Sequence, residues 1–207
     1  MTDTTRKLYY SPNLNPRVAV AVARHLNSPV EYVRFDPMGR DKEWVRALNP
    51  NSRAPMLVED GVPLWETDAI ALRLSQISGT DFWPEHRMVE VIKWISWSAH
   101  HFTRAGDVLY FERIVGPQFL PRPPDEVAIA NATGSFLEFA AILDGALAGR
   151  TWLIDDKLSY ADFRVASALP FAERAQLPLA DFPHVRAWND RLNAIDAWRE
   201  PFAGLAA

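Results

Sequence analysis

Cysteine is absent from the 207-residue sequence. This absence excludes a disulfide framework, a thiolate metal site and a cysteine nucleophile supplied by the protein itself. If thiol chemistry takes place here, the thiol must therefore arrive with a ligand.

The sequence also lacks a long apolar run and a cluster of basic residues. No apolar stretch approaches the roughly 18 to 20 residues that a membrane span needs, and the polar start, MTDTTRK, does not resemble a signal peptide. We therefore expect a cytoplasmic protein with no membrane partner. A formal charge of −4 without a Lys/Arg cluster gives no electrostatic basis for nucleic-acid binding. A hydrophobic content of 48% is ample for a globular core, so a small-molecule ligand is the better hypothesis.

Strand-like and helix-like stretches alternate at the start of the chain. KLYY at residues 7–10 and VEYVRF at residues 30–35 are typical of strands, and residues 16–26 between them favour a helix. This order predicts a βαβ unit with a right-handed crossover. Arg17 and Arg24 are expected on the exposed face of its helix.

A short helix, a hairpin and a third helix follow. Residues 41–48 favour the short helix, and PMLVEDGVPLW at residues 55–65 predicts the hairpin, because Asp60-Gly61 suits a tight turn. Pro63 cannot donate a ladder hydrogen bond, so its strand should lie at the edge of the sheet. Residues 67–78 carry apolar residues at helical spacing and end at a glycine. The predicted order over residues 1–80 is β-α-β-α-β-β-α.

Strand signals disappear after residue 80, and amphipathic helical patterns take their place. We expect a linker at residues 81–86 and an all-helical domain at residues 87–207. Two apolar stripes are expected to form its core. They are Met88, Ile92, Ile95, Ala99 and Phe102, and Phe136, Ala140, Leu143 and Leu147.

The stretch from Asn49 to Ile70 is the most informative part of the sequence. Pro55 at the start of a strand makes the Ala54–Pro55 bond a candidate for the cis form and leaves the backbone of Ala54 free to bind a ligand's peptide group. Glu66 and Thr67 fall at a strand-to-helix junction, where a hydroxyl and the first helical N–H groups can hold a carboxylate. Together these residues predict a site for a peptide with an anionic end.

At these positions the sequence resembles the glutathione S-transferase family, and the resemblance covers essentially the whole chain. It rests on Asn49-Pro50, on Ala54-Pro55 in place of the usual Val-Pro, and on ETDAI at residues 66–70 in place of Glu-Ser-x-Ala-Ile. It implies a thioredoxin-like N-terminal domain followed by an all-helical C-terminal domain, an α/β plus all-α fold. Glutathione as co-substrate, a small hydrophobic electrophile and a homodimer are the implied ligands and assembly.

The resemblance also implies roles for individual residues. The backbone of Ala54, before Pro55, would hold the cysteine moiety of glutathione. Glu66 and Thr67 would hold its γ-glutamyl end, and Arg53 its glycine carboxylate.

The stretch SPNLNPRV, residues 11–18, corresponds to the part of the family that contacts the glutathione sulfur through a Tyr, Ser or Cys. Here Leu14 matches one serine position and Asn15 matches the bacterial cysteine position. Asn15 is the first catalytic candidate, because its amide can donate to a thiolate while the helix N-terminus lowers the thiol pKa. Ser11 is the second. In the structural alternative Asn15 is only the N-cap before Pro16, and Ser11 only ends the strand.

Two further patterns concern the helical part. Ser159 and Asp162 in LSYADFRVA form a capping box, an element that the family shares and that has a role in folding. His100 and His101 invite a metal hypothesis, but neighbouring helical residues point about 100° apart, and no third ligand is suitably spaced. No metal site is expected.

The sequence therefore favours a detoxifying glutathione transferase that conjugates or reduces small apolar electrophiles. A disulfide reductase or peroxidase that uses the same thiol is one alternative. A glutathione-binding interaction protein without turnover is the other.

Overall fold

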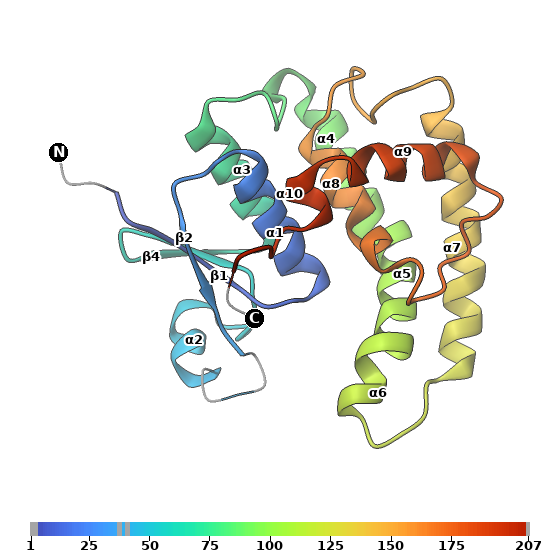
Figure 1. Cartoon of the computed structure of the whole chain (residues 1–207), viewed down its shortest axis with the longest axis horizontal. Helices are drawn as coiled ribbons and strands as arrows, with labels where there is room; N and C mark the ends of the chain where they lie inside the picture. The colour runs from blue at the N-terminus through green and yellow to red at the C-terminus, as the bar shows by residue number, and fades with distance from the viewer. Residues whose placement is uncertain (1–3, 37–38, 40–41, 206–207) are drawn as a thin grey trace. The chain divides into compact units, whose positions relative to one another are not determined.

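The computed structural model describes residues 4–36, 39 and 42–205. It contains two compact units. One unit comprises the described residues up to Trp83 together with those from Asp196 onward, and the other is Pro84–Ile195 (Figure 1). The sequence placed residues 196–207 in the helical domain, whereas the described residues from Asp196 onward belong to the first unit.

The first unit is built around one four-stranded mixed sheet. Its strands are β1 (Arg6–Tyr10), β2 (Glu31–Arg34), β3 (Met56–Glu59) and β4 (Val62–Trp65), in the order β2-β1-β3-β4. The pair β1–β2 is parallel, and β1–β3 and β3–β4 are antiparallel. The predicted β-α-β-α-β-β-α order and thioredoxin-like fold are confirmed.

Helices cover both faces of this sheet. The unit contains α1 (Leu14–His25), α2 (Lys42–Leu48), α3 (Thr67–Ser78) and α10 (Asp196–Arg199). Helices α1 and α3 pack together on one face, and α2 lies on the other (Figure 1). The expected start of α2 at residue 41 lies outside the described residues. Because side chains alternate along a strand, Tyr10 is buried and Tyr9 packs toward Trp44 of α2.

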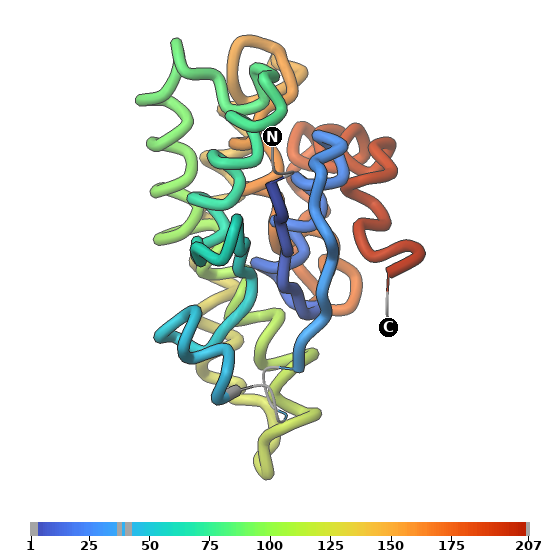
Figure 2. The backbone as a smooth tube through the Cα atoms, turned by 90° about the vertical axis from the view of Figure 1, so that its left-hand side faces the viewer, coloured from blue at the N-terminus to red at the C-terminus, as the bar shows by residue number. Residues whose placement is uncertain are grey.

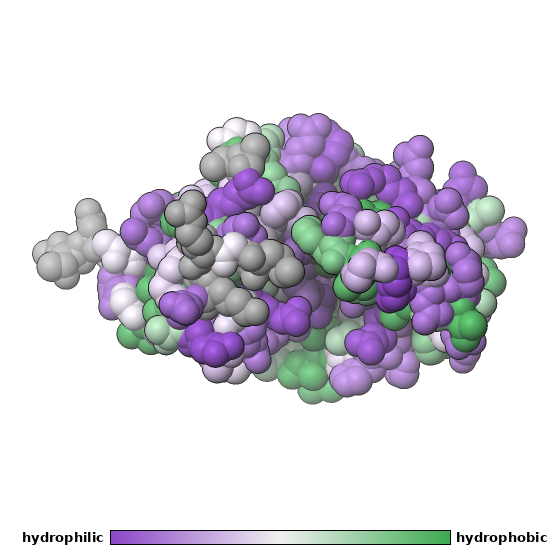
Figure 3. All heavy atoms as spheres, turned by 90° about the horizontal axis from the view of Figure 1, so that it is seen from below, coloured by the Kyte–Doolittle hydropathy of each residue, from purple (hydrophilic) through white to green (hydrophobic). Residues whose placement is uncertain are grey.

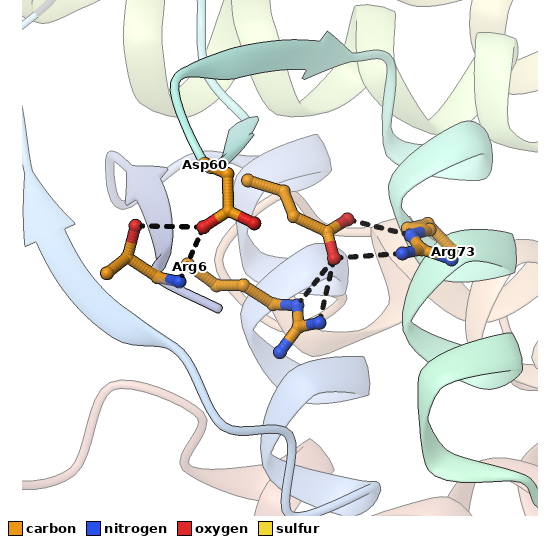
Figure 4. Close-up of polar contacts among 5 residues, drawn as sticks. Arg6, Asp60 and Arg73 are labelled. Atoms are coloured by element: carbon orange, nitrogen blue, oxygen red, sulfur yellow. Dashed lines mark hydrogen bonds and ion pairs between the residues drawn. The ribbon is translucent and has the colours of Figure 1, made fainter. Parts of the chain in front are cut away.

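The hairpin between β3 and β4 has the expected tight turn. Asp60 and Gly61 have φ angles of 49° and 84°, and β4, with Pro63, is an edge strand. Next to the turn, the Glu59 carboxylate accepts hydrogen bonds from Arg6 of β1 and from Arg73 of α3. Figure 4 shows Arg6 and Arg73 reaching this carboxylate from two different directions. The network therefore links the sheet to α3.

The second unit is helical throughout its regular structure. Its longer helices are α4 (Met88–His100), α5 (Phe102–Tyr110), α7 (Glu126–Leu147) and α9 (Pro183–Asn193). The shorter ones are η1 (Glu85–Arg87), the π-helix η2 (Phe111–Val115), α6 (Gly116–Phe119), α8 (Tyr160–Val165) and η3 (Ala166–Phe171). An all-helical second part is thus confirmed.

One of the two predicted apolar stripes is correct and the other is not. Phe136, Ala140, Leu143 and Leu147 of α7 are all buried. In α4 the buried side chains are Val91, Trp94 and Ser98, while Ile92 is 52% exposed. The stripe failed because α4 has apolar residues on more than one face, and periodicity alone does not say which face is covered.

Helix α7 is, by length and composition alone, apolar enough to cross a membrane. Its buried stripe packs against α5 and α9. Figure 3 shows a mostly polar face of the molecule, on which apolar side chains gather in separate small patches.

Candidate functional site

The strand register brings three predicted segments to one end of the sheet. Met56, the first residue of β3, pairs with Tyr9 of β1 and with Trp65 of β4. The residues just beyond these pairs are therefore neighbours in space. They are Ser11 after β1, Ala54-Pro55 before β3, and Glu66-Thr67 after β4.

The loop before β3 has a free backbone group beside Pro55. The Ala54–Pro55 peptide bond is cis. Neither the N–H nor the C=O of Ala54 takes part in a hydrogen bond with another described residue. A ligand's peptide group can therefore pair with both.

Asn49 holds this loop in place. Its buried side chain donates to the Arg53 carbonyl at 2.8 Å and accepts from the Asn51 N–H at 3.0 Å. The Arg53 side chain is exposed and makes no hydrogen bond or ion pair with the described residues. From the sequence, Asn49-Pro50 was only a match to the family, and this positioning role was not predicted. An Asn at the start of a turn is nevertheless a known signal for hydrogen bonds between its side chain and the nearby backbone.

The junction between β4 and α3 combines an unusual backbone with exposed charge. Glu66 has a φ of 74° and a ψ of 127°, a conformation that non-glycine residues rarely adopt, and such positions concentrate at functional sites. Its side chain is exposed and has no partner among the described residues. Thr67 begins α3, whose first N–H groups lack acceptors inside the helix and favour an anion.

The start of α1 differs from the sequence prediction. The helix begins at Leu14, with Asn13 in the N-cap position, so Asn15 is not the N-cap and Pro16 is the third helical residue. The Arg17 N–H donates to the Asn13 carbonyl at 2.9 Å, which closes the first turn two residues earlier than expected. Proline is tolerated there because the N–H groups of the first turn lack helical acceptors in any case.

The two catalytic candidates have different environments. Asn15 is exposed in the first turn of α1. Ser11 is buried, and its Oγ lies 3.4 Å from the Asn13 Nδ2, which donates to it. Leu14, at the serine-matching position, is buried as well. Accessibility therefore favours Asn15 over Ser11 as a contact for a bound thiol.

A contact between Thr67 and Asn15 joins the two halves of the predicted site. The Thr67 hydroxyl is 3.4 Å from the Asn15 carbonyl oxygen, to which it donates. The N-termini of α1 and α3 therefore lie side by side, and their partial positive charges add at the same end of the sheet. The hydroxyl proton is used in this contact, which leaves the backbone N–H of Thr67 for an anionic ligand.

Arg17 is a second correction to the sequence prediction, which placed it on an exposed face. Only 6% of Arg17 is exposed. Its guanidinium donates to the carbonyls of Trp198 and Arg199 and lies 4.8 Å from the centre of the Trp198 ring. Burial lowers the pKa of Arg17 to about 10, so the group is still cationic at neutral pH.

A groove of about 690 Å³ lies at the other end of α1. Arg24, Asn27 and Tyr32 line one side of it, and Arg199 and Ala203 are among the residues on the other. None of the predicted site residues lines this groove, so it is separate from the site at the helix N-termini.

Comparison with known proteins assigns the family. The model of the glutathione S-transferase N-terminal domain matches residues 5–75, and that of the C-terminal domain matches residues 108–196. Glutathione S-transferase 3 of Zea mays is 30% identical over 96% of this chain and 94% of its own length. The chain belongs to the glutathione S-transferase family. It is also 29% identical to elongation factor 1-gamma of Schizosaccharomyces pombe, over 90% of this chain and 47% of that protein.

Solved structures show the same glutathione S-transferase fold. The apo form of glutathione S-transferase III superposes with a TM-score of 0.84 at 25% identity, covering 98% of both chains. A theta-class glutathione S-transferase from Xanthomonas axonopodis pv. citri, solved with glutathione bound, gives a TM-score of 0.81 at 24% identity, again over 98% of both chains. The fold of this family member is therefore the one expected from its sequence.

Proposed function

We propose that the protein is a glutathione-dependent transferase that conjugates or reduces small apolar electrophiles. Glutathione would lie across the end of the sheet, with its thiolate at the N-terminus of α1. The contact between Thr67 and Asn15 is the observation that carries this proposal, because it joins the peptide-binding half of the site to the thiol-binding half. The solved relative with glutathione bound supports the choice of ligand.

The charges and free backbone groups suit the parts of a γ-glutamyl-cysteinyl-glycine tripeptide. The unpaired Ala54 backbone would bind the cysteinyl peptide group. The Glu66 carboxylate would bind the γ-glutamyl amine, and the N–H of Thr67 its carboxylate. The exposed Arg53 guanidinium would bind the glycine carboxylate.

Activation of the thiol would depend on electrostatics rather than on a general base. The N-terminus of α1 favours the anionic thiolate, and the Asn15 amide adds a hydrogen-bond donor. The thiolate would then attack an electrophile held close to it, so proximity supplies much of the remaining acceleration.

The test is the pKa of the thiol of bound glutathione, measured by thiolate absorbance across pH. In the wild type we expect a pKa below that of free glutathione, and Asn15→Ala should raise it by up to about one unit, or about 1.4 kcal/mol. Ser11→Ala is the matched comparison and should change it less. A larger effect of Ser11→Ala would make Ser11, not Asn15, the residue that contacts the thiolate. No binding of glutathione at all would show that the Arg53–Thr67 assignment is wrong.

A non-catalytic glutathione-binding protein is the second candidate. Leu14 is buried where some relatives have a catalytic serine, and one relative is named as an elongation factor. This function predicts that glutathione binds without any lowering of its thiol pKa. Reduction of disulfides or peroxides uses the same thiolate and is distinguished from conjugation by its products.

Two further properties remain proposals. A homodimer is supported by the exposed apolar side chains at the start of α4, where Val89 is 82% exposed, because a second copy could cover them. A monomeric mass in analytical ultracentrifugation would contradict it. The cytoplasmic location is a prediction from the sequence.

A further inference from the structure

Residues 196–205, named here the return segment, pack along α1 of the first unit. Figure 2 shows this red segment beside the blue trace of the first unit. It consists of α10 and the turns after it, and Trp198 of α10 is fully buried. The segment therefore forms part of the packing of the unit that holds the proposed glutathione site.

Arg17 is the central contact between α1 and the return segment. As described above, its guanidinium caps the carbonyls of Trp198 and Arg199, the last two residues of α10. A cation at this end of a helix satisfies carbonyls that lack helical partners and suits the helix dipole. Within the described residues no carboxylate forms an ion pair with Arg17, so its buried charge is balanced by these carbonyls and by the face of the Trp198 ring.

The return segment contacts the chain on both sides of residues 11–15. Before them, Tyr10 stacks on Phe202, with ring centres 5.5 Å apart and an angle of 20° between the rings. After them, Arg17 contacts Trp198. The turn that would hold the thiolate is thus fixed at both ends by residues that lie far away in the sequence.

We propose that Arg17 is a positioning residue for the thiolate site. By fastening the first turn of α1 to the return segment, it keeps Asn15 and the helix N-terminus aimed at the bound thiol. This inference rests on the proposed function for its chemical meaning. No hydrogen bond or ion pair joins Arg17 to the peptide-binding residues from Arg53 to Thr67, all of which the structure describes, so their affinity for glutathione should be largely independent of it.

The test compares Arg17→Met and Arg17→Lys with the control Arg24→Met. Arg24 also anchors the return segment, through the Ala203 carbonyl, but it lies at the far end of α1. We expect hydrogen exchange in residues 8–16 of the glutathione-free protein to become at least about tenfold faster in Arg17→Met and to stay unchanged in Arg24→Met.

With glutathione, Arg17→Met should raise the pKa of the bound thiol and lower kcat about five- to tenfold at neutral pH, with less than about a threefold change in KM. Arg17→Lys should reverse part of the rise in thiol pKa and part of the fall in kcat, because an ammonium group can still donate to a carbonyl. Partial rescue also excludes a variant that simply fails to fold.

Two outcomes would overturn the proposal. One is an Arg17→Met variant whose hydrogen-exchange rates and bound-thiol pKa equal those of the wild type. The other is that Arg17→Met and Arg24→Met change the hydrogen exchange, the thiol pKa and kcat to the same extent. If the wild-type protein does not bind glutathione, the proposed function fails, and hydrogen exchange alone then decides whether Arg17 positions the turn.

Discussion

Each of the two units has a buried charge at the end of a helix, and these two charges have opposite signs. In the helical unit, Asp162 is fully buried at the start of α8, and in the first unit Arg17 is buried against the end of α10. Burial moves both groups toward their neutral forms, raising the pKa of Asp162 to about 6 and lowering that of Arg17 to about 10. Neutral pH is thus about one unit from the first value and about three from the second. Mild acidification therefore neutralises Asp162 and leaves Arg17 charged.

The two charges also differ in how far away their partners lie in the sequence. Asp162 accepts hydrogen bonds from the N–H and hydroxyl of Ser159, from the Leu153 N–H and from the Trp188 indole. Ser159 is three residues away, whereas the Trp198 carbonyl that Arg17 caps is 181 residues away. A short motif can reveal the first arrangement but not the second.

Removing the buried anion should have the largest effect on stability. Asp162→Ala leaves four buried donors without an acceptor, so we expect it to lower the free energy of unfolding by about 3 to 5 kcal/mol, measured in urea. The matched control is Asp156→Ala, since Asp156 also accepts a backbone N–H, that of Thr151, but is exposed. Equal losses in the two variants would mean that burial does not set the strength of the Asp162 network.

The pH dependence of the same site should be smaller and should have a definite sign. Because the folded-state pKa of Asp162 is about 6 and the ordinary value is 3.8, the folded protein binds more protons between these values. The contribution of this group to stability is therefore largest below about pH 4 and falls by about 3 kcal/mol as the pH rises through 6.

The difference in unfolding free energy between the wild type and Asp162→Asn isolates this effect, because asparagine does not titrate. We expect the difference to shift in favour of the variant between pH 4 and pH 6 and to be constant above that range. A difference that is flat throughout would show that the four hydrogen bonds offset the cost of burial.

The smallest effect is expected for Glu59, a more exposed charge held by Arg6 and Arg73. Glu59→Gln should lower the unfolding free energy by about 1 kcal/mol, and 1 M salt should reduce this loss. The hydrogen bond from Arg73 is the main cause that lowers the pKa of Glu59 to about 2. Its contribution is therefore present above about pH 4.5 and lost as the pH falls toward 2. A salt-independent loss would place Glu59 with the buried charges.

Much of the fold could be predicted because its signals are local. The Asp60-Gly61 turn, the end of α3 at Gly79 and the Ser159–Asp162 capping box each depend on residues only a few positions apart. The peptide-binding half of the candidate site could also be predicted from local signals, because Pro55 and Glu66 mark the ends of paired strands.

The parts that the sequence did not predict depend on tertiary choices. Asn13 and Asn15 are both good caps, and the turn after β1 selects Asn13. Arg17 lies on a helix whose sequence pattern is amphipathic. Only the tertiary contact with the return segment shows that the face of α1 carrying Arg17 is covered. In α4 the apolar face with Ile92 was predicted to be core, but the chain itself does not cover it.

The return segment also has a consequence for the order of folding during synthesis. Domains generally fold as units, starting with the part that is made first. Here the first unit lacks α10 until the whole helical unit has been translated. Tyr10 and Arg17 therefore cannot make their contacts with Phe202 and Trp198 before that point. A nascent chain that ends before Asp196 would therefore expose the face of α1 that the return segment later covers.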